Sequence, residues 1–373
     1  MSAPTEETVD VLIIGAGPGG TSAAITLAHQ HPEWTIVLLD KATFPRDKIC
    51  GDGLSPEAAS LLVELGAGDV LTTARAVHGI SLSAPGGLTF TTRVSDPGYV
   101  VPRRVLDAAL VREAERAGVH VLREHAEKLR RVEGAVMINE TWRARHIIAA
   151  DGANSRVRRE LSLGGATGRN LSFGIRAYAP DHYGDLRIGW DAEIDGGYWW
   201  SFPLGDGTAN VGLGGVKQHM PNLSDARATM ENRLGFDLAG ATLRGHHLPL
   251  STAGLCAAVP GVLFVGDAAG LINPLSGEGI FYALVSGQLA GRALGASQPE
   301  AVYRRGLARR LGAHRASSAI AYRWMSPRWI DAAIAAGERH PRAFSDLRGL
   351  TLGTGRLTPR LLGMMAYERF RAR

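Results

Sequence analysis

The feature that most constrains the fold is a glycine-rich turn near the start of the chain. The apolar run at residues 9–14 has the composition of a parallel strand that is buried on both faces. The turn Gly15-Ala-Gly17-Pro-Gly-Gly20 follows directly, and an alanine-rich helix is expected from there toward His31. A second strand at 35–39 ends at Asp40, twenty residues after Gly20. This order and spacing predict a βαβ unit of the kind that binds a dinucleotide.

Each residue of the pattern has a physical task. Gly15 permits the tight turn, Gly17 lets a pyrophosphate approach the backbone, and Gly20 lets the helix pack closely on the strand. The free amide groups and the positive dipole end of the helix favour phosphate at its N-terminus. Asp40 is placed to accept hydrogen bonds from the adenosine ribose hydroxyls. The same glycines also suit close packing alone, and the pattern serves NAD and FAD alike.

Two further segments favour FAD. Residues 147–158 predict a strand that leads into Asp151-Gly152 and then into the basic start of a helix. Residues 261–270 predict another apolar strand, which closes on Gly266-Asp267 and is followed by small residues. The small residues allow a close approach to the backbone, and Asp267 can bond a ribityl hydroxyl. A helix that starts near Gly277 would direct its positive N-terminal end at the O2 edge of a flavin.

With these segments in order, the chain resembles the p-hydroxybenzoate-hydroxylase-type flavoproteins, and within them most resembles the geranylgeranyl reductase family. Residues 44–53 (FPRDKICGDG) resemble the family's loop that runs along the flavin. Residues 198–203 (YWWSFP) fit the YxWxFP motif that shapes the substrate cavity, and residues 273–280 (NPLSGEGI) are similar to the PxxGEGI stretch. The resemblance covers most of 9–294, and the residues after it are much less diagnostic.

The resemblance implies roles for individual residues. Arg103, four residues before Asp107 at the start of an amphipathic helix, sits where these proteins place an arginine near the flavin phosphates. The residues expected to hold the cofactor are Gly15, Gly17, Gly20, Asp40, Arg46, Lys48, Cys50, Gly51, Arg103, Asp151, Gly266, Asp267, Gly277, Gly279 and Ile280. Those expected to line the substrate cavity are Tyr198, Trp200, Phe202 and Pro203. Cys50 and Tyr198 are the candidate catalytic residues for a proton-transfer step.

Cys50 and the histidine pair also have structural interpretations. Cys50 could be a small buried hydrophobe, whereas a reactive thiol needs partial exposure and a cationic neighbour such as Lys48 or Arg46. His246 and His247 have no accompanying cluster with metal-ligand spacing, so a surface or strand-end pair is the favoured interpretation and no metal is expected.

Aromatic and arginine-rich stretches are equally ambiguous on sequence alone. The alternation at 198–202 is typical of a core strand, but one face of that strand should line the cavity, so the two interpretations coincide. The arginines of the first helix in the C-terminal region favour a solvated face, with contact to a membrane surface or a pyrophosphate as the alternative. They are Arg304, Arg305, Arg309, Arg310 and Arg315.

The expected fold class is α/β, with a Rossmann-like FAD-binding domain interleaved with a mixed or antiparallel-sheet substrate domain and followed by a helical C-terminal region. The FAD-binding domain is assigned to 1–78, 103–165 and 258–298, the substrate domain to 79–102 and 166–257, and the helical region to 299–373. The substrate domain should contain a hairpin at 80–83 and 88–91 and strands at 172–178, 186–190, 198–202 and 209–214. A strand at 262–265 should return the chain to the first domain. Helices should follow Gly279, with breaks at Pro327, Pro341 and Pro359.

The resemblance implies an FAD-dependent oxidoreductase. NAD(P)H would reduce the flavin, and the reduced flavin would pass hydride to a carbon–carbon double bond of an isoprenoid or related lipid or natural product. An FAD-dependent monooxygenase of an aromatic or polyketide substrate is the main alternative. A non-catalytic prenyl-binding escort is disfavoured by the intact nucleotide segments. A flavin-dependent halogenase is disfavoured because such enzymes need a lysine in the region after the first βαβ unit. No lysine occurs between Ile49 and Glu127.

Composition sets the cellular expectation. The net charge of +5 comes mostly from arginine, because only four lysines are present, and no motif for nucleic-acid binding accompanies it. This charge is compatible with an anionic substrate or membrane surface. The two cysteines, Cys50 and Cys256, suit a reducing compartment. We found no signal-peptide pattern and no apolar run of about 18 residues, so a cytoplasmic protein is expected, with peripheral contact to the inner face of a membrane left open. The substrate, electron donor and oligomeric state stay open.

Overall fold

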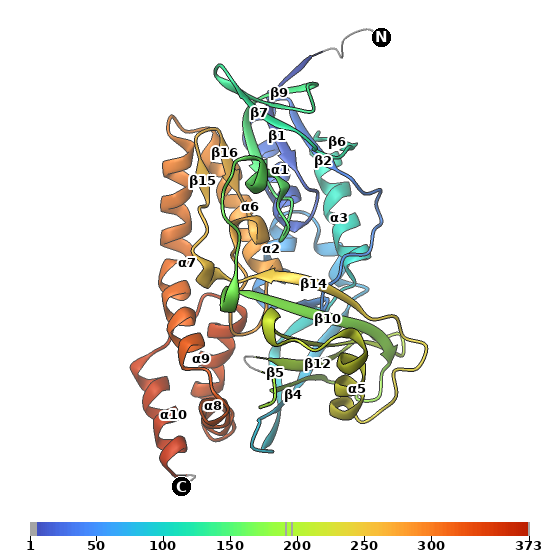
Figure 1. Cartoon of the computed structure of the whole chain (residues 1–373), viewed down its shortest axis with the longest axis vertical. Helices are drawn as coiled ribbons and strands as arrows, with labels where there is room; N and C mark the ends of the chain where they lie inside the picture. The colour runs from blue at the N-terminus through green and yellow to red at the C-terminus, as the bar shows by residue number, and fades with distance from the viewer. Residues whose placement is uncertain (1–5, 191, 195–196, 372–373) are drawn as a thin grey trace.

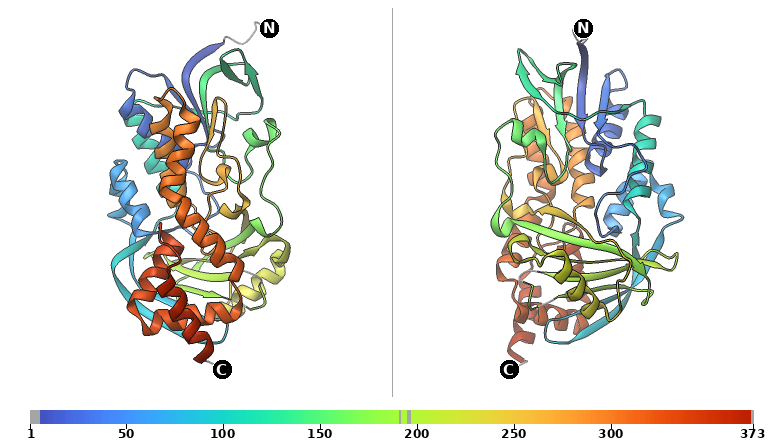
Figure 2. Two further views of the ribbon diagram at one scale, coloured as in Figure 1. Left: turned by 90° about the vertical axis from the view of Figure 1, so that its left-hand side faces the viewer. Right: turned by 45° about the vertical axis from the view of Figure 1, so that its right-hand side comes forward.

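The computed structural model describes residues 6–190, 192–194 and 197–371 and contains two eight-stranded sheets. In Figure 1 the first sheet occupies the upper half of the molecule and the second the lower half, while the C-terminal helices run down the left side. The chain crosses between the sheets several times, so segments that are far apart in sequence meet where the two sheets approach each other (Figure 2).

The first sheet has the order β15-β16-β9-β1-β2-β6, with the hairpin β7-β8 attached to β9. Its parallel strands are β1 (Glu7–Ile14), β2 (Ile36–Asp40), β6 (His120–Arg123), β9 (Trp142–Ala149) and β16 (Val262–Phe264). Its antiparallel additions are β7 (Leu129–Val132), β8 (Ala135–Ile138) and β15 (Ala258–Val259). The apolar runs of the central strands are buried together with helices α1 (Pro18–Gln30), α3 (Arg103–Arg116) and α6 (Ile280–Leu294) in one large core. This is the pattern of a sheet covered on both faces.

The second sheet is mixed. Its order is β14-β10-β13-β12-β11-β4-β5-β3, and the β4–β11 pair is parallel while the others are antiparallel. The strands are β3 (Gly53–Leu54), β4 (Arg75–Ser83), β5 (Thr89–Val100), β10 (Leu171–Pro180), β11 (Leu186–Trp190), β12 (Tyr198–Pro203), β13 (Thr208–Val216) and β14 (Arg244–Pro249). Helix α5 (Leu223–Leu234) packs on one face, where Trp199, Leu213 and Met230 belong to a small separate core.

The C-terminal region consists of four helices, each with a proline at its first position. They are α7 (Pro299–Trp324), α8 (Pro327–Arg339), α9 (Pro341–Leu352) and α10 (Pro359–Arg371). Proline suits this position because its fixed φ is helical and its missing N–H would be unpaired there in any case. Two polar contacts fix the region to the β4–β5 hairpin: the Gly86 N–H donates to Asp331 at 2.7 Å, and Arg348 forms a two-pronged ion pair with Asp96.

Most of the predicted elements are confirmed. The hairpin, the four strands of the second sheet and the helix breaks at the three prolines occur where the sequence indicates. The helix expected near Gly277 begins instead at Ile280. Several elements were not predicted, among them α2 (Pro56–Glu64), α5, the β7–β8 hairpin and β14. The division of the chain into domains stays a prediction. Within the described ranges, no helix has the length and apolar character needed to cross a membrane.

Candidate functional site

Four predicted nucleotide segments meet at one edge of the first sheet. Gly15 follows β1, Asp40 ends β2, Asp151 follows β9, and Gly266 follows β16. These four strands are neighbours and parallel, so their carboxyl ends lie side by side. In open α/β sheets this edge is where ligands bind.

The glycines of the first turn have three different environments. Gly15 has φ +103°, and a Cβ there would lie 2.4 Å from the Ala150 carbonyl oxygen. A Cβ on Gly20 would lie 1.9 Å from the Gly15 oxygen, so this glycine allows the turn and helix α1 to pack closely. At Gly17 the nearest atoms to an added Cβ are guanidinium nitrogens of Arg46 and Arg103, both at 3.8 Å. The backbone at Gly17 is therefore open toward two cations, which fits a pyrophosphate.

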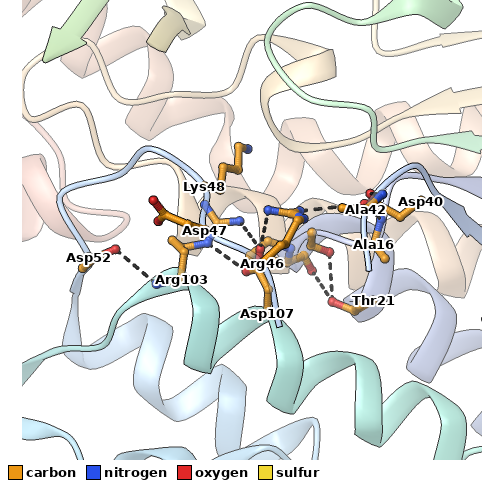
Figure 3. A network of polar contacts seen from close by, with 12 residues as sticks. Ala16, Thr21, Asp40, Ala42, Arg46, Asp47, Lys48, Asp52, Arg103 and Asp107 are labelled. Atoms are coloured by element: carbon orange, nitrogen blue, oxygen red, sulfur yellow. Dashed lines mark hydrogen bonds and ion pairs between the residues drawn. The ribbon is translucent and has the colours of Figure 1, made fainter. Parts of the chain in front are cut away.

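One carboxylate holds both cations (Figure 3). Arg103 donates from Nε and Nη2 to the two oxygens of Asp107, at 2.8 Å each, and Arg46 Nη1 lies 3.0 Å from Asp107 Oδ2. Asp107 is fully buried and Arg103 nearly so. The two guanidinium groups thus share the Asp107 carboxylate, and an Nη2 atom of each faces the Gly17 turn. Asp40 lies farther from Arg46, at 3.8 Å, and accepts hydrogen bonds from the Ala16 and Ala42 amides.

The segments expected along the flavin line a cavity of about 400 Å³. Its lining includes Lys48, Cys50, Gly51, Arg103, Asp267, Gly277, Gly279 and Ile280 from the predicted cofactor residues. Lys48 points away from the Asp107 cluster in Figure 3, and its Nζ lies 3.6 Å from Asp267 Oδ2. The same Nζ would be 3.8 Å from a Cβ on Gly152, so the 147–158 segment also approaches this end of the cavity. The structure brings all three nucleotide motifs together.

Aromatic rings form one wall of this cavity. Tyr198, Trp200 and Phe202 alternate along β12, and all three line the cavity. Neighbouring rings are 5.7 Å apart for Tyr198 and Trp200 and 6.3 Å apart for Trp200 and Phe202. Trp190 from the adjacent strand adds a fourth ring, 6.4 Å from that of Tyr198. Side chains alternate between the faces of a strand, so Trp199 lies on the opposite side, in the small core under α5.

Pro203 and the histidine pair lie elsewhere than the sequence suggested. Pro203 follows Phe202 on the opposite face of β12, is buried, and is not part of the cavity lining. His246 and His247 lie within β14 rather than at its end, pair with Gly174 and Phe173 of β10, and are both half-buried. His246 lines the cavity, and burial together with the nearby Lys48 lowers its pKa to about 4, so its imidazole is neutral.

A buried hydrogen-bond network joins the loop at residues 44–53 to the aromatic wall. The Asn210 amide donates to the Cys50 carbonyl at 2.8 Å and to Asp52 at 2.9 Å, and its oxygen accepts from Trp200 Nε1 at 3.0 Å. The Tyr178 hydroxyl also donates to Asp52, at 2.6 Å. Burial raises the pKa of Asp52 despite these hydrogen bonds. The sequence analysis included Asp52 only as a member of the loop at residues 44–53 and predicted no role for Asn210 or Tyr178. The one available signal was an acidic residue between two glycines beside the expected cofactor.

Besides Asp52, three further acidic groups in the cavity lining hold their protons more tightly than usual. Burial raises the pKa of the half-buried Cys50 thiol, with Arg103 opposing it in part, so the group is a neutral thiol rather than a thiolate. The Tyr198 hydroxyl donates to the Ser276 carbonyl at 2.5 Å, and burial raises its pKa far above the usual range. Burial also raises the pKa of Glu278 to about 7. Cys50 and Tyr198 therefore both carry a proton at neutral pH.

The raised pKa of Glu278 predicts a pH-dependent stability. A glutamate carboxyl group titrates at about pH 4.3 in an unfolded chain. The stabilisation of the folded state by protonated Glu278 is therefore fully present below that pH and is lost as the pH rises through about 7. Between about pH 5 and pH 9 we expect the melting temperature of the protein to fall more than that of Glu278→Gln. The glutamine keeps an oxygen for the Phe281 amide, which donates to Glu278 at 2.8 Å. Thermal melts of both proteins across this range are the measurement, and parallel curves would contradict the assignment.

The far end of the cavity is built by the C-terminal helices. Residues of α7, α8, α9 and α10 contribute mostly apolar side chains to its lining, among them Trp324, Trp329, Ile330, Phe344, Leu347 and Met365. The cavity lining therefore includes the cofactor segments, the aromatic wall and a part of the chain that the sequence did not predict to line it.

Arg158 is another residue whose role the sequence did not indicate. It is buried, and its guanidinium donates to the carbonyls of Gly164, Cys256 and Ala268. These bonds connect the helix after Asp151 to the loop that carries Asp267. Arg158 thereby positions two cofactor segments relative to each other.

Comparison with known proteins agrees with this geometry. The chain matches the family described as FAD binding domain over residues 8–182 and the geranylgeranyl reductase catalytic domain over residues 182–241. It is 33% identical over 322 residues to a menaquinone reductase of Mycobacterium tuberculosis, covering 78% of this chain and 77% of that protein. It is 34% identical over 317 residues to digeranylgeranylglycerophospholipid reductase 1 of Methanopyrus kandleri, covering 76% and 79%.

Solved structures share the fold. A geranylgeranyl bacteriochlorophyll reductase-like protein from Thermoplasma acidophilum superposes with a TM-score of 0.79 at 23% identity, covering 97% of each chain. The flavin-dependent brominase Bmp2 superposes with a TM-score of 0.70 at 18% identity and 98% coverage of each chain. At these identities the likeness concerns the fold alone.

Proposed function

Because this chain belongs to the geranylgeranyl reductase family of FAD-dependent oxidoreductases, we propose that it reduces carbon–carbon double bonds in an isoprenoid chain carried by a larger lipid or quinone. The relatives named above act, by their names, on menaquinone and on a digeranylgeranyl glycerophospholipid. The observation that carries the proposal is the apolar cavity described above. Its lining joins the predicted cofactor segments, the aromatic wall and the C-terminal helices, and so offers an apolar site for a prenyl chain.

We assign the cofactor-binding roles as follows. The Gly17 backbone with Arg46 and Arg103 would bind the pyrophosphate of FAD, and Asp40 would bind the adenosine ribose. Asp267 would bind the ribityl chain, with Lys48 beside it. Bound FAD would supply the hydride chemistry, while the chain itself binds, orients and excludes water. We further propose NAD(P)H as the reductant, to be tested by comparing NADPH, NADH and a reduced ferredoxin as electron sources.

Proton delivery is assigned to Cys50 and Tyr198. Both groups line the cavity beside the aromatic wall and keep their protons at neutral pH, as a general acid must. Asn210 is assigned a positioning role, because it fixes the Cys50 backbone and the Trp200 ring at once. Isoprenoid chains of this kind partition into bilayers, so an encounter with a membrane surface is part of the proposal.

The test is anaerobic. The purified, FAD-loaded protein is reduced and mixed, without oxygen, with menaquinone and separately with a geranylgeranyl glycerophospholipid. Reoxidation of the flavin together with a product whose prenyl chain has gained two hydrogens is the expected result with at least one of them. For menaquinone the product is reoxidised to the quinone before its mass is measured, so that reduction of the ring is not counted. No anaerobic reoxidation, but incorporation of labelled oxygen into an aromatic or polyketide compound in air, would overturn the proposal in favour of a monooxygenase.

A further inference from the structure

The outward side of α7 presents a continuous exposed stripe. Its residues recur every three or four positions and so lie on one helical face; they are Arg305, Arg309, Ala313, Ala316, Ile320, Arg323 and Trp324, hereafter the α7 face. The side chains of Ile320 and Trp324 are 45% and 50% exposed. Helix α7 forms the outer edge of the molecule in Figure 1 and faces the viewer in the left panel of Figure 2.

Aromatic side chains extend this face onto the neighbouring helices. The Trp324 ring stacks on that of Trp329 from α8, with centroids 6.4 Å apart and planes inclined by 23°. Arg369 from α10 lies over the other indole, 4.4 Å from the Trp329 centroid. Tryptophan side chains of this kind prefer the boundary between apolar and aqueous phases.

The surrounding charge is strongly positive. Residues 299–371 contain 14 arginines, no lysine and five acidic residues, a net charge of +9 against +5 for the whole chain. Within the described ranges no ion pair is formed by Arg305, Arg309 or Arg323. Four of the five acids are instead engaged inward or with other arginines: Glu300 with the Gly261 amide, Asp331 with the Gly86 amide, Asp346 with Arg360, and Glu368 with Arg339.

We infer that the α7 face docks the protein on the surface of an anionic lipid bilayer, an inference that rests on the proposed isoprenoid substrate. An exposed helical face with isoleucine and tryptophan beside unpaired arginines has the chemistry of an interfacial helix: the apolar side chains enter the lipid boundary and the arginines contact acidic head groups. Trp324 of the α7 face also lines the cavity, as does Trp329, on which its ring stacks, so the docking face adjoins the prenyl-binding cavity. A prenyl chain could enter the cavity there without crossing water.

The experiment measures binding of the full-length, FAD-loaded protein to sedimenting vesicles. Vesicles of phosphatidylcholine are compared with vesicles that also contain phosphatidylglycerol. The wild type should bind the anionic vesicles, bind the neutral ones weakly, and be released by salt. The double variant Ile320→Glu with Arg309→Glu should bind the anionic vesicles at least about tenfold more weakly. Neither residue lines the cavity, so its turnover of a short, detergent-dispersed prenyl substrate should equal that of the wild type.

A matched control carries the same changes on other helices. Leu223 on α5 is 54% exposed and Arg112 on α3 is exposed, and the variant Leu223→Glu with Arg112→Glu should keep full vesicle binding. Equal binding of the wild type to neutral and anionic vesicles, or equal loss in the control, would overturn the inference. So would a dimer in solution that the α7-face variant converts to a monomer, because the face would then belong to a second copy of the chain. Vesicle binding without turnover of any prenyl compound would count against the proposed function and not against docking.

Discussion

Alanine at position 17 is expected to raise the dissociation constant for FAD on the order of a hundredfold while leaving the protein folded. An added Cβ at this site meets only the ends of two flexible arginine side chains, at 3.8 Å, so the fold has room for it. The methyl group would occupy the space through which a pyrophosphate approaches the backbone between Arg46 and Arg103. Titration of the flavin-free Gly17→Ala protein with FAD, followed by flavin fluorescence, gives the constant.

Gly20→Ala is the matched comparison, and it should disrupt folding rather than FAD binding alone. Its Cβ would lie 1.9 Å from a backbone oxygen that cannot move without opening the first turn. We expect little folded protein from this variant, seen as loss of the cooperative melt, whereas Gly17→Ala should melt near the wild-type temperature. If Gly17→Ala bound FAD as tightly as the wild type, the assignment of the pyrophosphate to this turn would be wrong.

The double variant Cys50→Ala with Tyr198→Phe should slow the anaerobic reoxidation of the reduced protein by its prenyl substrate on the order of a hundredfold to ten-thousandfold. Both substitutions remove a proton that burial holds on a group lining the cavity, and neither adds bulk. Stopped-flow spectroscopy of the single and double variants separates the two contributions. Reduction of the flavin by NAD(P)H should be much less affected, because it needs no proton from these groups.

Controls for this pair are available in the same chain. Tyr99 also lines the cavity, and Cys256 is an exposed free cysteine, so Tyr99→Phe and Cys256→Ala should leave the rate unchanged. A double variant at Cys50 and Tyr198 that reoxidises at the wild-type rate would remove both residues from the proton-transfer step. Unequal effects of the single variants would identify the principal donor.

The nucleotide edge was predictable because its signals are local. Gly15, Gly20 and Asp40 are fixed by the turn and the two strands that flank them, and parallel strands bring their carboxyl ends together whatever the rest of the chain does. The alternation in β12 likewise predicted that Tyr198 and Phe202 share a face.

The parts that escaped prediction depend on contacts between distant segments. Asn210 reaches Asp52 across 158 positions, and no local pattern marks either residue as a partner of the other. Pro203 was grouped with the motif to which it belongs, but strand alternation turns it away from the cavity. The place of His246 in the cavity lining was not predicted because β14, which pairs with β10, was not recognised as a strand. The role of α7–α10 depends on how they pack against the β4–β5 hairpin, through contacts such as Arg348 with Asp96.

Because of that packing, the residues that bind the cofactor and the residues that limit the size of the substrate lie on different parts of the chain. The nucleotide edge comes from the first sheet, whereas the far wall of the cavity comes from helices that make no part of that edge. Exchanging side chains on α8 and α9, for example at Phe344 or Leu347, would alter how long a prenyl chain fits while the cofactor segments stay unchanged. Relatives built on this plan can thus diversify by changing the side chains at one end of the cavity, and the length of the chain they accept can then evolve independently of the redox reaction.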